Sequence, residues 1–177
     1  MELETVIKRN SELVTIEKNQ HVFFQGERNG YLYFIEEGLL RAYYLLDNGD
    51  ERVKSFVSAG ALVGSLTAAY KKQECSFNLQ SILRSKLWRI SVEKLLSLAE
   101  ESHEVASDLI FRLLDLSMKK EQREYELLSL SAQERYISLR ENMPEVMQSV
   151  SQNNIARYLG ITPVALSRIK KRVKREA

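Results

Sequence analysis

The amino-acid sequence predicts an α+β protein with an antiparallel β-roll or jelly-roll domain, a long dimerisation helix and a small C-terminal helix-turn-helix domain. Six of the seven glycines lie within residues 26–64, between short runs of aromatic and aliphatic side chains. No glycine occurs between Gly64 and Gly160, and apolar residues recur there at helical spacing. Residues 151–177 combine a helical hairpin pattern with basic side chains. We place the domain division at 1–129 and 130–177.

The β-rich part consists of short runs separated by turn residues. Residues 31–35, 39–46 and 52–57 are the first runs, and residues 77–83 and 85–90 extend the series. Asp47-Asn48-Gly49-Asp50 separates two runs and is typical of a hairpin turn. Short strands at this spacing predict a barrel or jelly roll over roughly residues 15–91.

The sequence becomes helical after Ser91, which is a plausible N-cap. A single long helix is expected over about residues 102–129. Its apolar stripe includes Leu109, Leu113 and Leu116. The stripe could pack on the chain's own β-domain, but a helix of this length cannot hide all its apolar side chains there. We therefore favour a dimer seam formed by these three leucines.

Composition excludes several classes of function. The chain has 177 residues and a net charge of +2, and no apolar run is long enough to span a bilayer. Its acidic N-terminus, Met1-Glu2-Leu3-Glu4, is unlike a secretory signal, so a cytoplasmic protein with no membrane partner is expected. Cys75 is the only cysteine and there are two histidines, His21 and His103. We expect no internal disulfide, no metal site, no cofactor and no catalytic residue.

The charge is unevenly distributed. Residues 151–177 carry seven basic side chains and one acidic one, whereas residues 1–150 carry an excess of acidic side chains. A basic end on a mildly acidic body is typical of a polyanion-binding module, although a solvated basic tail has the same composition.

The pattern of residues 151–171 favours a helix-turn-helix. Ala156 allows the two helices to approach closely, and Gly160 stands at the turn, where a positive φ is needed. Ser151 and Thr162 can cap the two helices, with Pro163 at the first position of the second helix. A generic helical hairpin would explain this spacing, but it would not explain the basic residues that gather on the second helix.

The geometry of such a motif assigns a role to each exposed side chain. The second helix would enter the major groove, where Val164, Ser167, Arg168 and Lys171 can reach bases. Arg168 is the best candidate for a bidentate contact to guanine. The expected contacts to DNA phosphates come from Gln152, Asn153, Lys170, Arg172 and Lys174.

The order of these parts resembles the Crp/Fnr superfamily of bacterial transcription factors. The resemblance is closest in residues 33–44, in Glu134-Arg135-Tyr136, and in residues 158–163 and 166–169. It implies a sequence-specific homodimer on a near-palindromic double-stranded DNA operator, with RNA polymerase as a further candidate partner. The linker before Ser151 is short and the chain stops soon after the second helix, which leaves little room for the family's usual β-hairpin wing.

The sequence departs from the family's cyclic-nucleotide cassette. The matching positions are Gly64, Ser65 and Leu66, followed by Cys75 and Ser76. Ser65 replaces the glutamate that would bind the ribose hydroxyl, and Cys75 replaces the arginine that would pair with the cyclic phosphate. A buried phosphate without a cationic partner is costly, so control by cyclic AMP is not expected and the effector is unknown.

Two other functions remain open at this stage. The first is a cyclic-nucleotide-binding-like sensor or interaction module that does not bind DNA specifically. The second is a cupin-like enzyme, for which the strand region has too few histidines. Arg41 could face an interior pocket, but the outer face of its strand is the favoured position.

Overall fold

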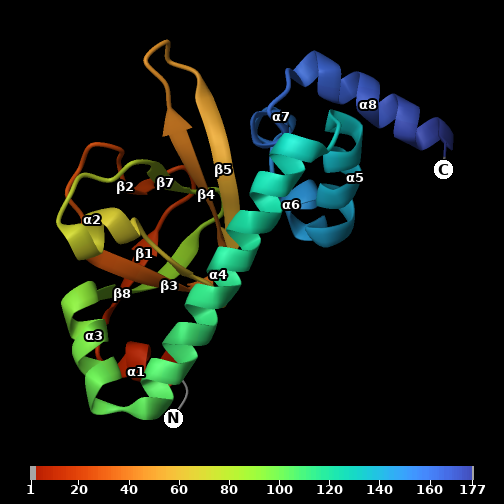
Figure 1. Ribbon diagram of the computed structural model, residues 1–177. Coiled ribbons are helices and arrows are strands. Elements are labelled where there is room, and N and C mark those ends of the chain that lie inside the picture. The colour runs from red at the N-terminus through yellow and green to blue at the C-terminus, as the bar shows by residue number, and fades with distance from the viewer. Residues whose placement is uncertain (1–2, 177) are drawn as a thin grey trace.

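The computed structural model describes residues 3–176, apart from the side chain of Glu176, and shows two antiparallel sheets followed by a helical region (Figure 1). One sheet has the strand order β1-β8-β3-β6 and the other β2-β7-β4-β5. The strands are β1 (Glu12–Ile16), β2 (His21–Phe23), β3 (Tyr31–Glu37), β4 (Leu39–Leu45), β5 (Glu51–Ser58), β6 (Leu62–Val63), β7 (Asn78–Ser81) and β8 (Ser85–Ser91). The predicted α+β class is confirmed.

The hairpin between β4 and β5 follows the predicted turn. Leu45 pairs with Glu51, and Gly49 has a φ of +83°. The amide of Leu46 donates to the carbonyl of Asp50 over 2.9 Å. This hairpin projects beyond the rest of the β-roll, and α7 (Gln152–Leu159) lies beside β5 (Figure 1).

Apolar side chains from both sheets form the core of the β-roll. Three helices, one before the first strand and two after the last, cover one end of it. Phe34 of β3 and Ile90 of β8 pack with residues of α1 (Leu3–Arg9), α3 (Val92–Glu101) and α4 (His103–Ser129). Ser91 caps α3 as predicted, and its side chain accepts from the amide of Lys94. A short helix, α2 (Leu66–Lys71), lies between β6 and β7. Among the described residues, no helix is long and apolar enough to cross a bilayer.

Four further helices follow α4: α5 (Ala132–Asn142), α6 (Pro144–Ser149), α7 (Gln152–Leu159) and α8 (Pro163–Glu176). The predicted caps are confirmed: Ser151 accepts from the amide of Asn154, and Thr162 from the amide of Ala165. Gly160 ends α7 with a φ of +70°. The turn therefore has the residue types that its geometry requires.

The C-terminal helices share a core with the β-roll. Tyr43 and Phe56 of the β4–β5 hairpin pack in one cluster with Tyr136, Ile155 and Leu166. This packing positions the helix-turn-helix against the β-roll of its own chain. The division of the chain between residues 129 and 130 stays a prediction.

Replacement of Gly160 by alanine is expected to lower the free energy of unfolding by about 1 kcal/mol, because a side chain strains the left-handed conformation. Nothing lies within 4 Å of the position that the new Cβ would take, so backbone strain is the only cost. Gly30→Ala is the matched control, since its Cβ also meets open space without a positive φ. Urea unfolding measures both variants, and equal loss of stability would contradict this account.

Candidate nucleic-acid interface

The predicted base-reading residues lie together on one exposed face of α8. Val164, Ser167, Arg168 and Lys171 are all exposed and follow one another at spacings of three, one and three residues, which places them on the same side of a helix. Leu166, Ile169 and Val173 are buried on the opposite side. The helix thus presents a largely polar and basic face to solvent, and Figure 1 shows α8 set apart from the two sheets of the β-roll.

The predicted phosphate contacts surround this face. Gln152 and Asn153 are exposed in the first turn of α7. The Lys170 Nζ donates to the Gln152 Oε1 over 2.8 Å, so two of the predicted residues already contact each other. Arg172 and Lys174 are also exposed, and the Arg172 Nη1 donates to the Gln133 Oε1 over 3.2 Å.

Tyr158 of α7 contacts both α4 and the β-roll. Its ring lies 5.1 Å from the ring of Phe56 in β5. The guanidinium carbon of Arg123 in α4 lies 3.7 Å from the centre of the same ring, and Arg123 also donates to the Tyr158 carbonyl. Burial raises the pKa of the Tyr158 hydroxyl. An aromatic side chain held on two sides restricts the rotation of α7 relative to the β-roll.

A cluster of charged and amide side chains forms a second junction between the β-roll and α7. The Glu51 Oε2 accepts from the Arg41 Nη1 over 2.6 Å and from the Arg157 Nη1 over 2.8 Å. The Arg41 Nη1 also donates to the Asn154 Oδ1 over 2.8 Å. Arg41 lies on the outer face of β4, as favoured, because its neighbours Leu40 and Ala42 pack in the interior of the β-roll. The expected solvent exposure is wrong, since Arg41 is only 7% exposed. Helix α7 covers Arg41. The contact between Arg41 and Asn154 could not be predicted from the sequence, because the two residues lie 113 positions apart.

The positions of the degenerate cassette have structural roles. A Cβ on Gly64 would lie 2.7 Å from the Leu32 Cδ2 and 2.9 Å from the Tyr31 carbonyl oxygen, so the close packing of the chain requires glycine. Ser65 is buried and caps α2. Cys75 is also buried, and burial raises the pKa of its thiol. Leu66 is partly buried and Ser76 is exposed. The absence of cyclic AMP control stays a prediction.

Lys54 is a half-buried cation that sequence reasoning missed. Its Nζ lies 4.1 Å from the centre of the Phe77 ring, which belongs to the interior of the β-roll. Burial, assisted by the charge of Lys120, lowers the Lys54 pKa to about 8. Lys54 falls at a register shift of β5, where Ala42 pairs with Ser55 but Tyr43 pairs with Val53. Such a bulge redirects side chains, so strand alternation could not place Lys54.

The dimer seam on α4 stays a prediction. Leu109 is buried at 9% exposure in the core that α4 forms with α1, α3 and the β-roll, so little of its side chain is left for a second chain to contact. Leu113 is exposed and Leu116 is half-buried. The apolar residues most exposed along α4 lie on the side opposite to Leu109: Ile110, Phe111, Leu114, Met118, Tyr125 and Leu128.

Within the part of the chain that the structure describes, no group of three or more histidine, cysteine, aspartate or glutamate side chains is placed to hold a metal ion.

Residues 13–102, which extend from β1 to the end of α3, match the family described as the cyclic nucleotide-binding domain. The chain belongs to the cyclic nucleotide-binding domain family. It is 29% identical over 180 residues to the fumarate and nitrate reduction regulatory protein of Vibrio cholerae, across 95% of this chain and 70% of that protein. It is 24% identical to the transcriptional activator protein anr of Pseudomonas aeruginosa, across 94% of this chain and 71% of that protein.

Solved structures show the same fold over nearly the whole chain. FixK2 from Bradyrhizobium japonicum matches with a TM-score of 0.80 at 19% identity, covering 94% of this chain and 85% of that one. The c-di-GMP-responsive regulator CLP of Xanthomonas campestris matches with a TM-score of 0.74 at 20% identity, covering 98% and 91%. Together with the curated relatives, these matches confirm the resemblance of this family member to the Crp/Fnr superfamily.

Glu51→Gln is expected to lower the free energy of unfolding by about 2 kcal/mol, because it leaves the buried Arg41 guanidinium without its anionic partner. Glu12→Gln is the matched control, since it breaks the exposed ion pair with Arg89 and should cost less than about 1 kcal/mol. Urea unfolding at pH 7 compares the two variants. If Glu51→Gln were as stable as the control, the junction would not stabilise the fold.

Proposed function

We propose that the chain is a sequence-specific DNA-binding transcription regulator that acts as a homodimer. The observation that carries the proposal is the exposed face of α8, which gathers Val164, Ser167, Arg168 and Lys171 opposite a buried apolar side. The regulator names of the relatives support this class over an enzyme, including the cupin-like one, and over an interaction module without DNA binding.

The roles of the α8 residues follow from major-groove geometry. The N-terminal half of a recognition helix faces the base edges. Arg168 has the two parallel N–H donors that match guanine O6 and N7, and Val164 offers an apolar contact to a thymine methyl group. Gln152, Asn153, Lys170, Arg172 and Lys174 would bind the phosphates on either side, which fixes the register and makes affinity depend on salt.

The exposed apolar side of α4 supports the homodimer. It runs over several turns of the helix and includes Phe111 at 70% exposure and Leu128 at 79%. A two-fold pairing of α4 with its copy would cover this surface and set two recognition helices for half-sites about one helical turn, ~34–36 Å, apart. Such a dimer fits a near-palindromic operator.

The proposed activity also implies a cellular location and a further partner. A regulator that reads chromosomal DNA would act in the cytoplasm of a bacterial cell and could contact RNA polymerase on the promoter. Control by cyclic AMP through the usual cassette is not part of the proposal, because Cys75 stands at the position of the phosphate-binding arginine, and both Cys75 and the nearby Phe77 are buried.

Arg168→Ala is expected to cost about 1–3 kcal/mol of affinity for the preferred operator and to relax the preference at one base pair of each half-site. The control Arg84→Ala removes an exposed arginine from the loop between β7 and β8, and should leave DNA binding unchanged. Fluorescence anisotropy on a set of single-base operator variants measures both. An equal loss on every sequence would show that Arg168 contacts only phosphate.

Leu114→Glu is expected to weaken the dimer at least about a hundredfold, because each protomer would bury a charge in the α4 interface. Leu83→Glu introduces the same charge at an exposed leucine outside α4 and should not affect association. Sedimentation velocity across a range of protein concentrations compares the variants. A dimer that persists in Leu114→Glu would place the interface elsewhere.

A further inference from the structure

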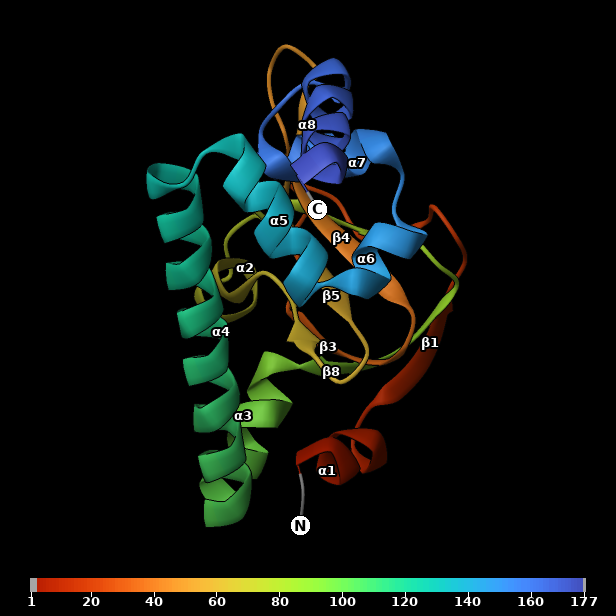
Figure 2. The same ribbon diagram turned by 90° about the vertical axis from the view of Figure 1, so that its right-hand side faces the viewer.

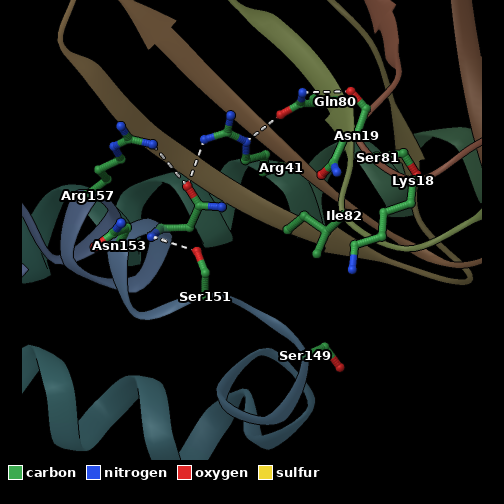
Figure 3. A pocket seen from close by; sticks show the side chains of 11 residues that line it. Lys18, Asn19, Arg41, Gln80, Ser81, Ile82, Ser149, Ser151, Asn153 and Arg157 are labelled. Atoms are coloured by element: carbon green, nitrogen blue, oxygen red, sulfur yellow. Dashed lines mark hydrogen bonds between the residues drawn. The ribbon is translucent and has the colours of Figure 1, made fainter.

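A polar cavity of about 320 Å³ lies between the β-roll and the start of the helix-turn-helix (Figure 3). One wall comes from the β-roll and includes Lys18 of the β1–β2 loop, Arg41 of β4 and Gln80 of β7. The other wall comes from α7 and the residues just before it, and includes Ser151, Asn153 and Arg157. A cavity of this size is at the small end of the range found for ligand sites.

The charge of the lining favours an anion. Three of the lining side chains are cations, Lys18, Arg41 and Arg157, and no carboxylate is among the residues that line the cavity. Glu51 lies behind this wall and neutralises part of the charge of the two arginines through one shared oxygen. Lys18 is exposed at the rim and adds a further positive charge. The cavity therefore keeps a positive surplus.

The lining is also prearranged for hydrogen bonding. Gln80 accepts from the Arg41 Nε over 2.8 Å, and the Arg41 Nη1 is held by Glu51 and Asn154. These bonds fix the buried guanidinium, so that little side-chain entropy is lost when a ligand binds. Apart from Ile82, the lining consists of charged, amide and hydroxyl side chains. Such a surface suits a small hydroxylated anion better than a flat aromatic base.

We propose that this cavity binds a small phosphorylated metabolite of the sugar-phosphate class. Its phosphate group would lie against Arg41 and Arg157, with Lys18 adding positive charge from the other side of the cavity (Figure 3), and its hydroxyl groups would bond to the amide and serine side chains. A ligand at this place contacts the β-roll and α7 together, so it would stabilise the docked position of the helix-turn-helix. The binding step does not require DNA, and it goes beyond the proposed DNA-binding function.

The test uses the full chain and two probes, inorganic phosphate and glucose 6-phosphate, with glucose at the same concentration and matched ionic strength as a blank. Amide chemical shifts in ¹⁵N-edited NMR spectra report where each probe binds, and their titration gives the dissociation constant. Lys18→Glu reverses the charge at the rim, and Lys94→Glu makes the same change on exposed α3, away from the lining residues.

The expected result is saturable binding of glucose 6-phosphate, with shifts at Asn19, Ser151 and Asn153 and none with glucose. Lys18→Glu should raise the dissociation constant roughly tenfold, and Lys94→Glu should leave it unchanged. Three results would overturn the proposal: no saturable binding, equal weakening by both variants, or shifts confined to α8, which would mean that the anion binds the basic helix instead of the cavity.

Discussion

One carboxylate oxygen of Glu51 accepts hydrogen bonds from two arginines that belong to different parts of the fold, Arg41 in β4 and Arg157 in α7. A guanidinium as deeply buried as that of Arg41 is stable only when it is paired and hydrogen-bonded, and at this site Glu51 and Gln80 of the β-roll accept from it. Helix α7 completes it by supplying Asn154. The shared carboxylate and the buried Arg41 thus link the helix-turn-helix to the β-roll through Arg157 and Asn154.

Other contacts around this junction also hold α7 against the β-roll. Tyr158 lies between Phe56 and Arg123, which ties α7 to β5 and to α4 at once. With α7 fixed, the buried residues of α8 turn inward and its basic face is directed to solvent. Figure 2 shows α8 at one end of the molecule, beyond the tip of the long α4, with the β-roll behind. Helix α4 likewise has one buried side and one exposed side. Val105 and Leu109 are buried in the chain's own core, while Phe111 and Leu114 are exposed.

Features with a local cause could be predicted from the sequence. Ser151, Gly160 and Thr162 act within one or two helical turns, so their residue types alone indicate the caps and the turn. The alternation of glycine-bearing turns and apolar runs likewise predicts the β-roll, although α1 and α2 are too short to stand out. Non-local features were missed. Arg41 and Asn154 are brought together only by the folded chain, and Lys54 faces inward because of a bulge.

Helix α4 shows that apolar spacing alone does not identify which side of a helix is buried within its own chain. A stripe that includes Leu109 and a stripe that includes Leu114 are both apolar, and spacing alone does not say which of them the β-roll covers. Packing decides it: Leu109 joins the core with Val105 and Leu95, which leaves Leu114 and its neighbours for another surface. The base-reading residues avoid this ambiguity because α8 has only one apolar side.

Selection of random DNA duplexes by the purified chain, at two salt concentrations, tests the central claim most directly. The account predicts enrichment of an inverted repeat whose half-sites are about one helical turn apart, with affinity that falls as salt rises but with the same preferred bases. Weak binding that salt abolishes, without enrichment of any sequence, would contradict the claim that the exposed face of α8 reads DNA.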